Sequence, residues 1–385
     1  MTGSSRRFRA SSRFELKRLD ELPPEQRGAF RELESDADFY GLLVPRPPTM
    51  LSIKSVAHET ASLLRTLATP AAIDADDDII DLVLDGVLEI EAERGFVAGV
   101  DAFPILFPEA RRTDGGSAIA RLSSEALEHA FDLATSEPGA LTSALYCYNR
   151  IPLTRFWLQR WAGRDEVLAE IGATGTLKSF LDRFWTLLPA ESSPSWISWQ
   201  SRSAAPRRRH EPAGVTWKLY VSPRPEHIGE AFAALVRVLA EIPGAQMKIG
   251  RDAAGLLRPD KLVSYFPNKG DLERAASALA PQLRGIPSHG VPFTAGIDED
   301  GVLSWGVDPP ESARALSWLG RESWRLWIAT RLGAALAFAK SGEPVDPATD
   351  DGMDLAVAFA TERVRRHDVD VQTWTPGPSL WRDLA

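Results

Sequence analysis

The sequence predicts an α+β protein with a helical N-terminal domain, a central α+β sheet domain and a helical C-terminal extension. The first observation is the alternation of apolar and polar residues over residues 215–222, which is typical of a half-buried strand. The second is the recurrence of apolar residues at helical spacing over much of residues 50–200 and again after Pro310. With 44% hydrophobic and 25% charged residues, the composition is that of a globular protein.

These patterns divide the 385 residues into five parts. The chain starts with a basic Ser/Arg-rich stretch that we expect to be mobile, apart from a short helix near Pro24 to Leu33. A polar stretch rich in arginine and proline before the alternating strand is typical of a linker. The expected parts are a flexible N-terminal arm and linker (1–45), a mostly helical domain (46–200), a linker (201–214), the sheet domain (215–310), and C-terminal helices with a tail (311–385).

Within the sheet domain the pattern predicts the order β-α-β-β-α-β-β. Strands are expected at 215–222, around Met247, and at 262–266, 291–297 and 302–307. Helices with apolar stripes are expected at 225–242 and 271–283. Asp298 to Gly301 has the composition of a hairpin turn between the last two strands.

Charge and cysteine content exclude several classes of function. A formal net charge of -9 disfavours a nucleic-acid binder. No apolar run is long enough to span a membrane, and the N-terminus lacks the apolar region of a secretory signal. The single cysteine, Cys147, excludes an internal disulfide framework and a cysteine-rich zinc site. We therefore expect a cytoplasmic protein with no nucleic-acid partner and no membrane partner.

The common catalytic motifs are absent from the sequence. It contains no Walker or kinase glycine-rich loop, no His-Arg-Asp catalytic loop and no Gly-x-Ser-x-Gly elbow. It also contains neither His-x-x-x-His nor Cys-x-x-Cys. We therefore expect no metal, no cofactor and no nucleotide site.

Cationic residues lie on three of the predicted strands. Alternation places Lys218 beside Tyr220 on the polar face of the first strand, Lys248 on the second, and Lys261 with Tyr265 on the third. Convergent cations on rigid strands suit an anionic ligand such as a phosphate. The alternative is that these lysines are solvated on the open face of an antiparallel sheet.

The same segments resemble a known enzyme family. The stretches Trp217-Lys-Leu-Tyr-Val-Ser, Met247-Lys-Ile-Gly-Arg-Asp and Lys261-Leu-Val-Ser-Tyr-Phe-Pro are similar to the lyase domain of class III and IV lanthipeptide synthetases. They also resemble the related Hop-type effector family, whose stand-alone members occur in class V lanthipeptide and thioamitide pathways. The resemblance covers about residues 215–309, so the sheet domain is expected to be phospholyase-like.

The resemblance implies elimination of phosphate from phosphoserine or phosphothreonine in a precursor peptide, which leaves dehydroalanine or dehydrobutyrine. It implies a leader-bearing precursor peptide, a separate peptide kinase and a cyclase as partners. Lys218 matches the position of the catalytic base in the family. The positions expected to surround the phosphate are Lys248, Arg251, Lys261 and Tyr265.

One position departs from the family pattern. The synthetase domains usually carry a histidine two residues after the base lysine, where this chain has Tyr220. Either Tyr220 acts as the general acid, or His227 or His289 takes that role, or elimination has been lost. Loss would leave a non-catalytic phosphopeptide-binding or scaffold subunit, and a thioether cyclase is a further alternative. Helix-borne arginines after the sheet domain could also clamp phosphate, namely Arg314, Arg321 and Arg325.

Overall fold

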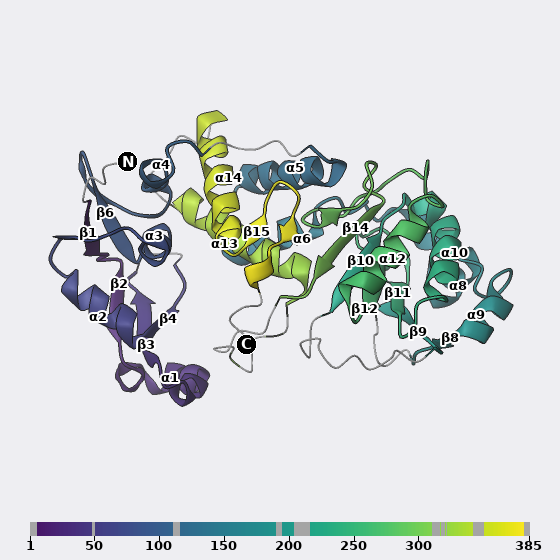
Figure 1. The fold of residues 1–385 in the computed structure, drawn as a ribbon, viewed down its shortest axis with the longest axis horizontal. Helices are drawn as coiled ribbons and strands as arrows, with labels where there is room; N and C mark the ends of the chain where they lie inside the picture. Colours follow the sequence, from purple (N-terminus) through teal and green to yellow (C-terminus); the bar gives the residue numbers. More distant parts are fainter. Residues whose placement is uncertain are drawn as a thin grey trace.

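A computed structural model describes residues 6–47, 51–110, 116–189, 195–203, 216–309, 316, 320, 322–341 and 350–380. The predicted α+β class is confirmed, since several antiparallel sheets are combined with many helices. Three units follow one another along the longest axis of the molecule: an N-terminal unit, a bundle of helices and a unit built on a large sheet (Figure 1).

The N-terminal unit contains two small sheets, which corrects two expectations. Residues 7–45 are not a flexible arm, because β1 pairs with two other strands and Phe8 is fully buried. The next sixty residues are not mainly helical, because they contribute four strands. The strands are β1 (Arg7–Ala10), β2 (Phe14–Lys17), β3 (Phe39–Pro45), β4 (Lys54–Ala57), β5 (Ala71–Ala72), β6 (Leu88–Ala92) and β7 (Gly95–Val97).

Short helices cover these two sheets. The predicted helix that starts at Pro24 is confirmed. The sheet orders are β5-β1-β6-β7 and β2-β3-β4, both antiparallel. The helices are α1 (Pro24–Phe30), α2 (His58–Thr66), α3 (Asp77–Leu84) and α4 (Phe103–Leu106).

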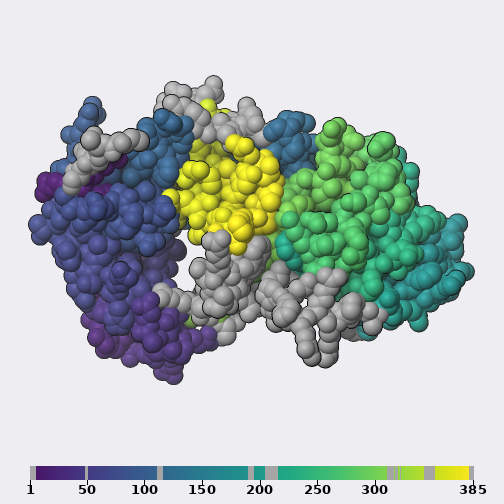
Figure 2. All heavy atoms as spheres, in the orientation of Figure 1, coloured from purple at the N-terminus to yellow at the C-terminus, as the bar shows by residue number. Residues whose placement is uncertain are grey.

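The C-terminal helices form the middle of the molecule instead of an extension. They pack against two helices from the region before the sheet, and Figure 2 shows the C-terminal residues seated between the N-terminal unit and the sheet unit. The ring of Phe103 meets that of Phe359 edge to face, so one core continues into the N-terminal unit. The helices are α5 (Ala118–Asp132), α6 (Pro138–Cys147), α13 (Trp324–Ser341) and α14 (Asp350–Arg365), and a small hairpin of β15 (Val369–Asp370) and β16 (Thr375–Pro376) follows.

The third unit is built on a seven-stranded antiparallel sheet with the order β13-β14-β10-β12-β11-β9-β8. Two of its strands, β8 and β9, come from the region expected to be helical, so the boundary near residue 200 is wrong. The physical reason is visible in β9, where Ile197 and Trp199 alternate into the core. The strands are β8 (Trp185–Leu187), β9 (Trp196–Ser201), β10 (Trp217–Val221), β11 (Gln246–Gly250), β12 (Leu262–Phe266), β13 (Ala295–Gly296) and β14 (Leu303–Val307).

One face of this sheet packs against helices and forms the largest core. Leu219 and Val221 of β10 are fully buried there, as alternation predicts, among the apolar residues of α10 and α12. The predicted β-α-β-β-α-β-β order over the sheet domain is found with one difference, the short helix α11 between β11 and β12, where a loop was expected. The helices of this unit are α7 (Arg155–Arg160), α8 (Arg164–Glu170), α9 (Lys178–Phe184), α10 (Ile228–Leu239), α11 (Ala253–Leu256) and α12 (Lys269–Leu279).

Two further expectations concern the linker at residues 201–214 and the absence of a membrane-spanning segment. Ser201, the first residue of the expected linker, belongs to β9, and residues 204–215 lie outside the described part of the chain. Among the helices that the structure describes, none combines the length and hydropathy needed to cross a bilayer.

Candidate functional site

The candidate site lies on the second face of the large sheet, opposite the main core. Alternation in β10 places Lys218 and Tyr220 on this face, and the strand register sets Lys218 opposite Tyr265 on one side and Gly306 on the other. The face is covered, because Lys218 is only 8% exposed and Tyr220 only 3%. The alternative of solvated lysines on an open face is therefore wrong for Lys218.

The start of α13 contributes to this cover. Its first residue, Trp324, packs directly over β14, so that a Cβ placed on Gly306 lies 2.6 Å from Cδ1 of Trp324. The Trp324 indole also donates a hydrogen bond to the carbonyl oxygen of Phe293 at 3.0 Å. The absence of a side chain on Gly306, beside Lys218, is what allows the helix to come this close.

Lys218 is held by a carboxylate. Its Nζ forms an ion pair with Asp308, the residue directly after β14, and lies 5.6 Å from the centroid of the Tyr265 ring. Lys218 is thus fixed in position by a carboxylate on a nearly dry surface.

Lys248, on β11, lies on the other side of the same tyrosine ring. Its Nζ is 5.4 Å from the ring centroid of Tyr265 and 4.1 Å from that of Trp196. Burial, reinforced by the positive charge of Lys218, lowers the pKa of Lys248 to about 8. A substantial fraction of Lys248 is therefore a neutral amine near physiological pH, which is rare for a lysine.

A buried arginine–aspartate cluster borders the two lysines. Arg258 pairs with both carboxylate oxygens of Asp260, at 2.8 and 2.9 Å, and donates to the hydroxyl of Tyr146 at 3.1 Å. Arg325 of α13 lies 3.0 Å from Asp260 and donates to the backbone carbonyl of Tyr146 at 2.9 Å. Burial acts to raise the pKa of Asp260, but the charges of Arg325 and Arg258 outweigh it and hold that pKa well below its usual range.

This cluster brings together three segments that are far apart in the sequence. Tyr146 comes from α6, Arg258 and Asp260 from the segment before β12, and Arg325 from α13. Arg325 is the member of the helix-borne arginine set that the structure brings to the site. Arg314 and Arg321 lie outside the described residues.

Lys261 has a different environment from the other two lysines. It is fully buried, and its Nζ donates to the carbonyl oxygen of Pro223 at 3.0 Å and contacts Nδ1 of His289 at 2.6 Å. Nε2 of His289 faces the carbonyl oxygen of Asn149, which can only accept, so the ring donates from Nε2 and accepts from Lys261 at Nδ1. These contacts are those of a core lysine and leave little of its ammonium for a ligand.

The two histidines considered as acids are placed away from the lysine pair. Burial, together with the charge of Lys261, lowers the pKa of His289 to about 3, so this imidazole is neutral at physiological pH. His227 is more exposed, precedes α10 and contacts Glu230 at 3.5 Å. Neither supplies an imidazolium next to Lys218 or Lys248.

The remaining predicted residues are Tyr220, Tyr265 and Arg251. Burial raises the pKa of Tyr220 well above its usual value, and burial likewise raises that of Tyr265. Both phenols are therefore neutral donors. Arg251 follows β11 with an exposed side chain. The candidate site also contains five residues that the sequence patterns did not single out as functional: Tyr146, Trp196, Arg258, Asp260 and Asp308.

The arrangement suits a phosphate-bearing ligand. Lys218, Lys248, Arg258 and Arg325 supply cations, and Asp260 and Asp308 compensate for part of that charge. A buried excess of positive charge favours a ligand with more than one negative charge. Within the described residues, no group of three histidine, cysteine or acidic side chains is arranged to hold a metal ion.

Comparisons with known proteins give little that bears on this site. No protein-family model and no curated protein matches the chain. Among solved structures, the chain is similar to "the effector protein from Pseudomonas syringae pv. tomato strain DC3000", with a TM-score of 0.32 and 13% identity over 72% of this chain and 89% of that one. It is also similar to the effector protein from Pseudomonas syringae pv. syringae strain 61, with a TM-score of 0.38 and 9% identity over 67% of this chain and 98% of that one. Because these scores and identities are low, the function of this chain has to be argued from its own residues.

Proposed function

We propose that this chain eliminates phosphate from phosphoserine or phosphothreonine in a ribosomal precursor peptide, without a metal or other cofactor. The observation that carries the proposal is the pair of lysines on either side of the Tyr265 ring, one ion-paired and one with a lowered pKa. Elimination needs both an anion clamp and a neutral amine, and this pair offers one of each.

The proposed step breaks the Cα–H and Cβ–O bonds, and it forms a bond between the base and the proton as well as the Cα=Cβ double bond. A base removes the Cα proton, the electron pair of that C–H bond forms the Cα=Cβ double bond, and the Cβ–O bond breaks so that phosphate leaves with its electron pair. The Cα proton is a very weak acid, so a lysine can remove it only as a deprotonated, desolvated amine. Cations fixed near the phosphate and the amide oxygen stabilise the charge that develops there.

Lys248 is the better candidate for the base. At its pKa of about 8 it is partly neutral at physiological pH, whereas the nitrogen of Lys218 is engaged in the ion pair with Asp308. In this assignment Lys218 binds the phosphate or the developing enolate, together with Arg258. The family resemblance implies the reverse, with Lys218 as the base, and the two assignments predict different effects of substitution.

A second candidate function is phosphopeptide binding without chemistry. The observation that favours it is the position of Tyr220, a buried phenol of raised pKa where the family carries a histidine. A phenol is a weaker acid than an imidazolium, so departure of phosphate depends here on charge neutralisation by the cations. If that is insufficient, the same cluster still binds the phosphate group, as a scaffold subunit requires. In a thioether cyclase, the further alternative, the same cations would stabilise the enolate that forms when a thiol adds to the dehydro residue.

The proposal implies a set of partners. The sequence contains no recognisable nucleotide loop, so the phosphorylated peptide has to be supplied by a separate Ser/Thr peptide kinase. The dehydro product is an electrophile, and a cyclase that adds a thiol to it completes the reaction sequence. The precursor peptide is expected to bring a leader segment as well as the phosphorylated core.

The proposal is tested with a phosphoserine peptide, EDTA and no nucleotide, read by mass spectrometry. Wild-type protein is expected to remove the mass of phosphoric acid and to leave a product that is trapped by an added thiol. Lys248→Gln is expected to abolish elimination while binding of the phosphopeptide, read by fluorescence anisotropy, persists. Lys218→Gln is expected to weaken both. Lys178→Gln, on the exposed face of α9, is the matched control and leaves both unchanged.

Two results would count against this assignment. A phosphopeptide that stays intact even when kinase and leader are supplied, but binds in a Lys218-dependent manner, would support the binding function. Loss of elimination in Lys218→Gln with full activity in Lys248→Gln would restore Lys218 as the base.

A further inference from the structure

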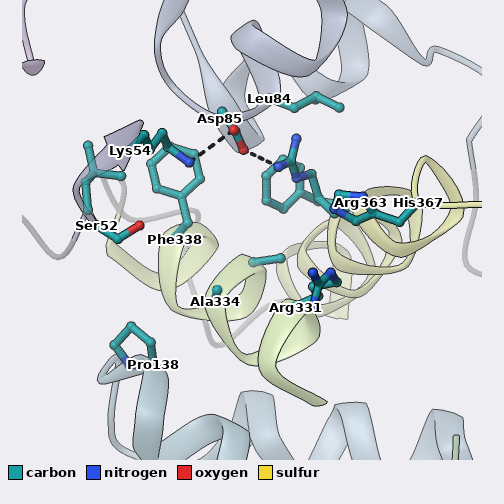
Figure 3. Close-up of a pocket in the computed structure, with 13 residues that line it drawn as sticks. Ser52, Lys54, Leu84, Asp85, Pro138, Arg331, Ala334, Phe338, Arg363 and His367 are labelled. Carbon is teal, nitrogen blue, oxygen red and sulfur yellow. Dashed lines mark hydrogen bonds and ion pairs between the residues drawn. The ribbon is translucent and has the colours of Figure 1, made fainter. Parts of the chain in front are cut away.

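A second polar cavity lies on the side of α13 away from the large sheet. It has a volume of about 210 Å³ and is bounded by α13, α14 and the N-terminal unit (Figure 3). We call it the α13–α14 cavity. Its lining is divided into an apolar part that includes Leu84, Phe338 and Phe359, and a polar part formed by basic side chains.

The polar part contains more cations than anions. Asp85 is the acidic residue of the lining, and it is occupied by two ion pairs, one with Lys54 at 3.0 Å and one with Arg363. Figure 3 shows both bonds, of which the one to Arg363 joins the N-terminal unit to α14 and the one to Lys54 lies within the N-terminal unit. Arg331 is a third cation of the lining. Its ion pair in the described part of the chain is with Glu322, and it takes no part in the two ion pairs of Asp85.

Arg331 is half-buried, with incomplete compensation of its charge and hydrogen-bonding groups. Nη1 lies 3.5 Å from Glu322 and donates to the carbonyl oxygen of Trp327 at 3.1 Å, and the guanidinium lies 3.8 Å from the Trp327 ring. Nε is buried and has no hydrogen-bond partner in the described part of the protein. Burial lowers the pKa of Arg331 to about 10 in spite of Glu322. A buried donor without an acceptor is unusual and calls for a ligand or ion.

The imidazole of His367 also lines the cavity, next to Arg331 and Arg363. His367 is exposed at the rim of the cavity, but packing around its ring and the charges of Arg331 and Arg363 act to lower its pKa, which favours the neutral imidazole. Figure 3 shows Arg331 rising from α13 toward the side of the cavity where Arg363 and His367 lie. An acceptor placed there would meet two guanidinium groups and face the apolar part of the lining.

We propose that the α13–α14 cavity binds a small carboxylate joined to an apolar body. The carboxylate would accept from the accessible part of the Arg331 guanidinium and lie near Arg363, and the apolar body would contact Phe338 and Phe359. A guanidinium that offers adjacent N–H groups fits a planar carboxylate. The volume suits a group of amino-acid side-chain size. The proposal does not rest on the lyase function, because none of the lysine-site residues lines this cavity.

The proposal is tested with hexanoate as the probe, and with hexan-1-ol and hexylamine as matched controls of the same chain length. Binding is followed by NMR through the His367 ring resonance, assigned with His367→Gln, because this ring lines the cavity and meets the Trp327 ring edge to face. Hexanoate is expected to bind in the millimolar range or below, as its size allows, and at least tenfold more tightly than either control.

Two variants locate the carboxylate. Arg331→Gln is expected to weaken hexanoate binding at least tenfold, whereas Arg365→Gln, on α14 but outside the lining, leaves it unchanged. If Arg331→Gln proves unfolded in thermal melts, Arg331→Lys keeps the charge and removes the planar guanidinium, and it is expected to weaken binding at least threefold. Equal binding of hexanoate and hexan-1-ol, binding that survives both substitutions, or no shift at all would overturn the proposal.

The source of the carboxylate is decided by a second ligand pair. A short peptide ending in a leucine carboxylate is compared with the same peptide as its amide. Tighter binding of the peptide acid than of hexanoate would assign the cavity to a peptide terminus, and binding of hexanoate alone would assign it to a free small molecule. Both outcomes support the carboxylate site.

Discussion

Lys218, Lys248 and Lys261 lie on or beside three strands of one sheet, yet their ammonium groups have three different environments. The first is ion-paired with Asp308, the second faces aromatic rings, and the third is enclosed by backbone and imidazole acceptors. Burial lowers the pKa of Lys261 to about 7, but its three contacts show why that shift alone does not mark a catalytic group. A lowered pKa becomes useful only where a ligand can reach the amine.

The pH dependence of elimination is expected to follow Lys248. If the neutral amine is the base, kcat/KM rises tenfold per pH unit below about 8 and levels off above it, because the neutral fraction saturates. The measurement is the initial rate on the phosphoserine peptide from pH 6.5 to 9.5. A rate that falls through this range would mean that the protonated lysine is the active form.

Lys248 is also expected to reduce the stability of the fold. Its pKa is lower in the folded chain than in the unfolded chain, so the unfolded chain binds the proton more tightly. The resulting loss of stability is complete below about pH 8 and vanishes as the pH rises above the unfolded value near 10.5. Lys248→Met should therefore raise the free energy of unfolding by about 1–3 kcal/mol at pH 7 and by little at pH 10.5.

The comparison is made by urea unfolding of wild type and Lys248→Met at both pH values. A variant that is less stable than wild type at pH 7 would show that the amine contributes favourable contacts that exceed its desolvation. Gain of stability with loss of activity would be the expected trade-off at a functional site.

At the scale of single elements, α13 is the helix on which both sites depend. It brings Trp324 over the sheet, Arg325 to the Asp260 cluster and Arg331 to the α13–α14 cavity. Its position is set by close contact with α6, where a Cβ on Gly333 would lie 2.7 Å from the backbone nitrogen of Thr142. A glycine in mid-helix is explained here by packing, since helix propensity alone disfavours it.

Gly333→Ala and Gly28→Ala form a matched pair, both glycines within helices. The first is expected to lower the free energy of unfolding by about 1–3 kcal/mol, because the methyl group meets backbone that cannot move aside. The second has nothing within 4 Å of its Cβ position in α1 and is expected to be neutral or to stabilise by up to about 1 kcal/mol. The measurement is chemical unfolding, and equal effects at both positions would refute the packing explanation.

At the scale of the whole molecule, the N-terminal unit is attached largely through the C-terminal helices. Phe338 of α13 inserts against Gly86 and Gly99, and Lys54, Asp85 and Arg363 bridge the same region. Gly99 has φ of +63° and leaves no room for a side chain beside the Phe338 ring. The first and last parts of the chain thus pack together, and the C-terminal helices hold the N-terminal unit in place.

Phe338→Ala is expected to uncouple the N-terminal unit. Loss of a large aromatic contact costs about 3 kcal/mol in a well-packed site. All twelve tryptophans lie after residue 156, so tryptophan fluorescence reports on the helical and sheet units alone, whereas circular dichroism reports on every unit. The two signals should coincide in wild type and separate in Phe338→Ala, with the circular dichroism transition beginning first. Coincident transitions in both proteins would show that the units unfold together regardless of this contact.

The sequence by itself determined the α+β class, the order of strands and helices in the sheet domain apart from the short helix α11, and the two faces of β10. Alternation of period two assigns each side chain to a face, so Leu219 and Val221 could be placed in the core and Lys218 and Tyr220 opposite them. The hairpin turn at Asp298 was equally predictable from its composition. In the structure, the Asp298 carboxylate accepts hydrogen bonds from the backbone nitrogens of Gly301 and Leu303.

Only the tertiary structure decided what covers the lysine face and which lysines share an environment. Periodicity describes the two sides of one element, but it carries no information about the element that packs on each side. Asp260, Arg325 and Tyr146 meet because α6 and α13, far apart in sequence, lie side by side, and β9 joins the sheet from a region that was expected to be helical from the spacing of its apolar residues. Burial, ion pairing and the lowered pKa of Lys248 all follow from those long-range contacts, which is why they could not be obtained from the sequence pattern.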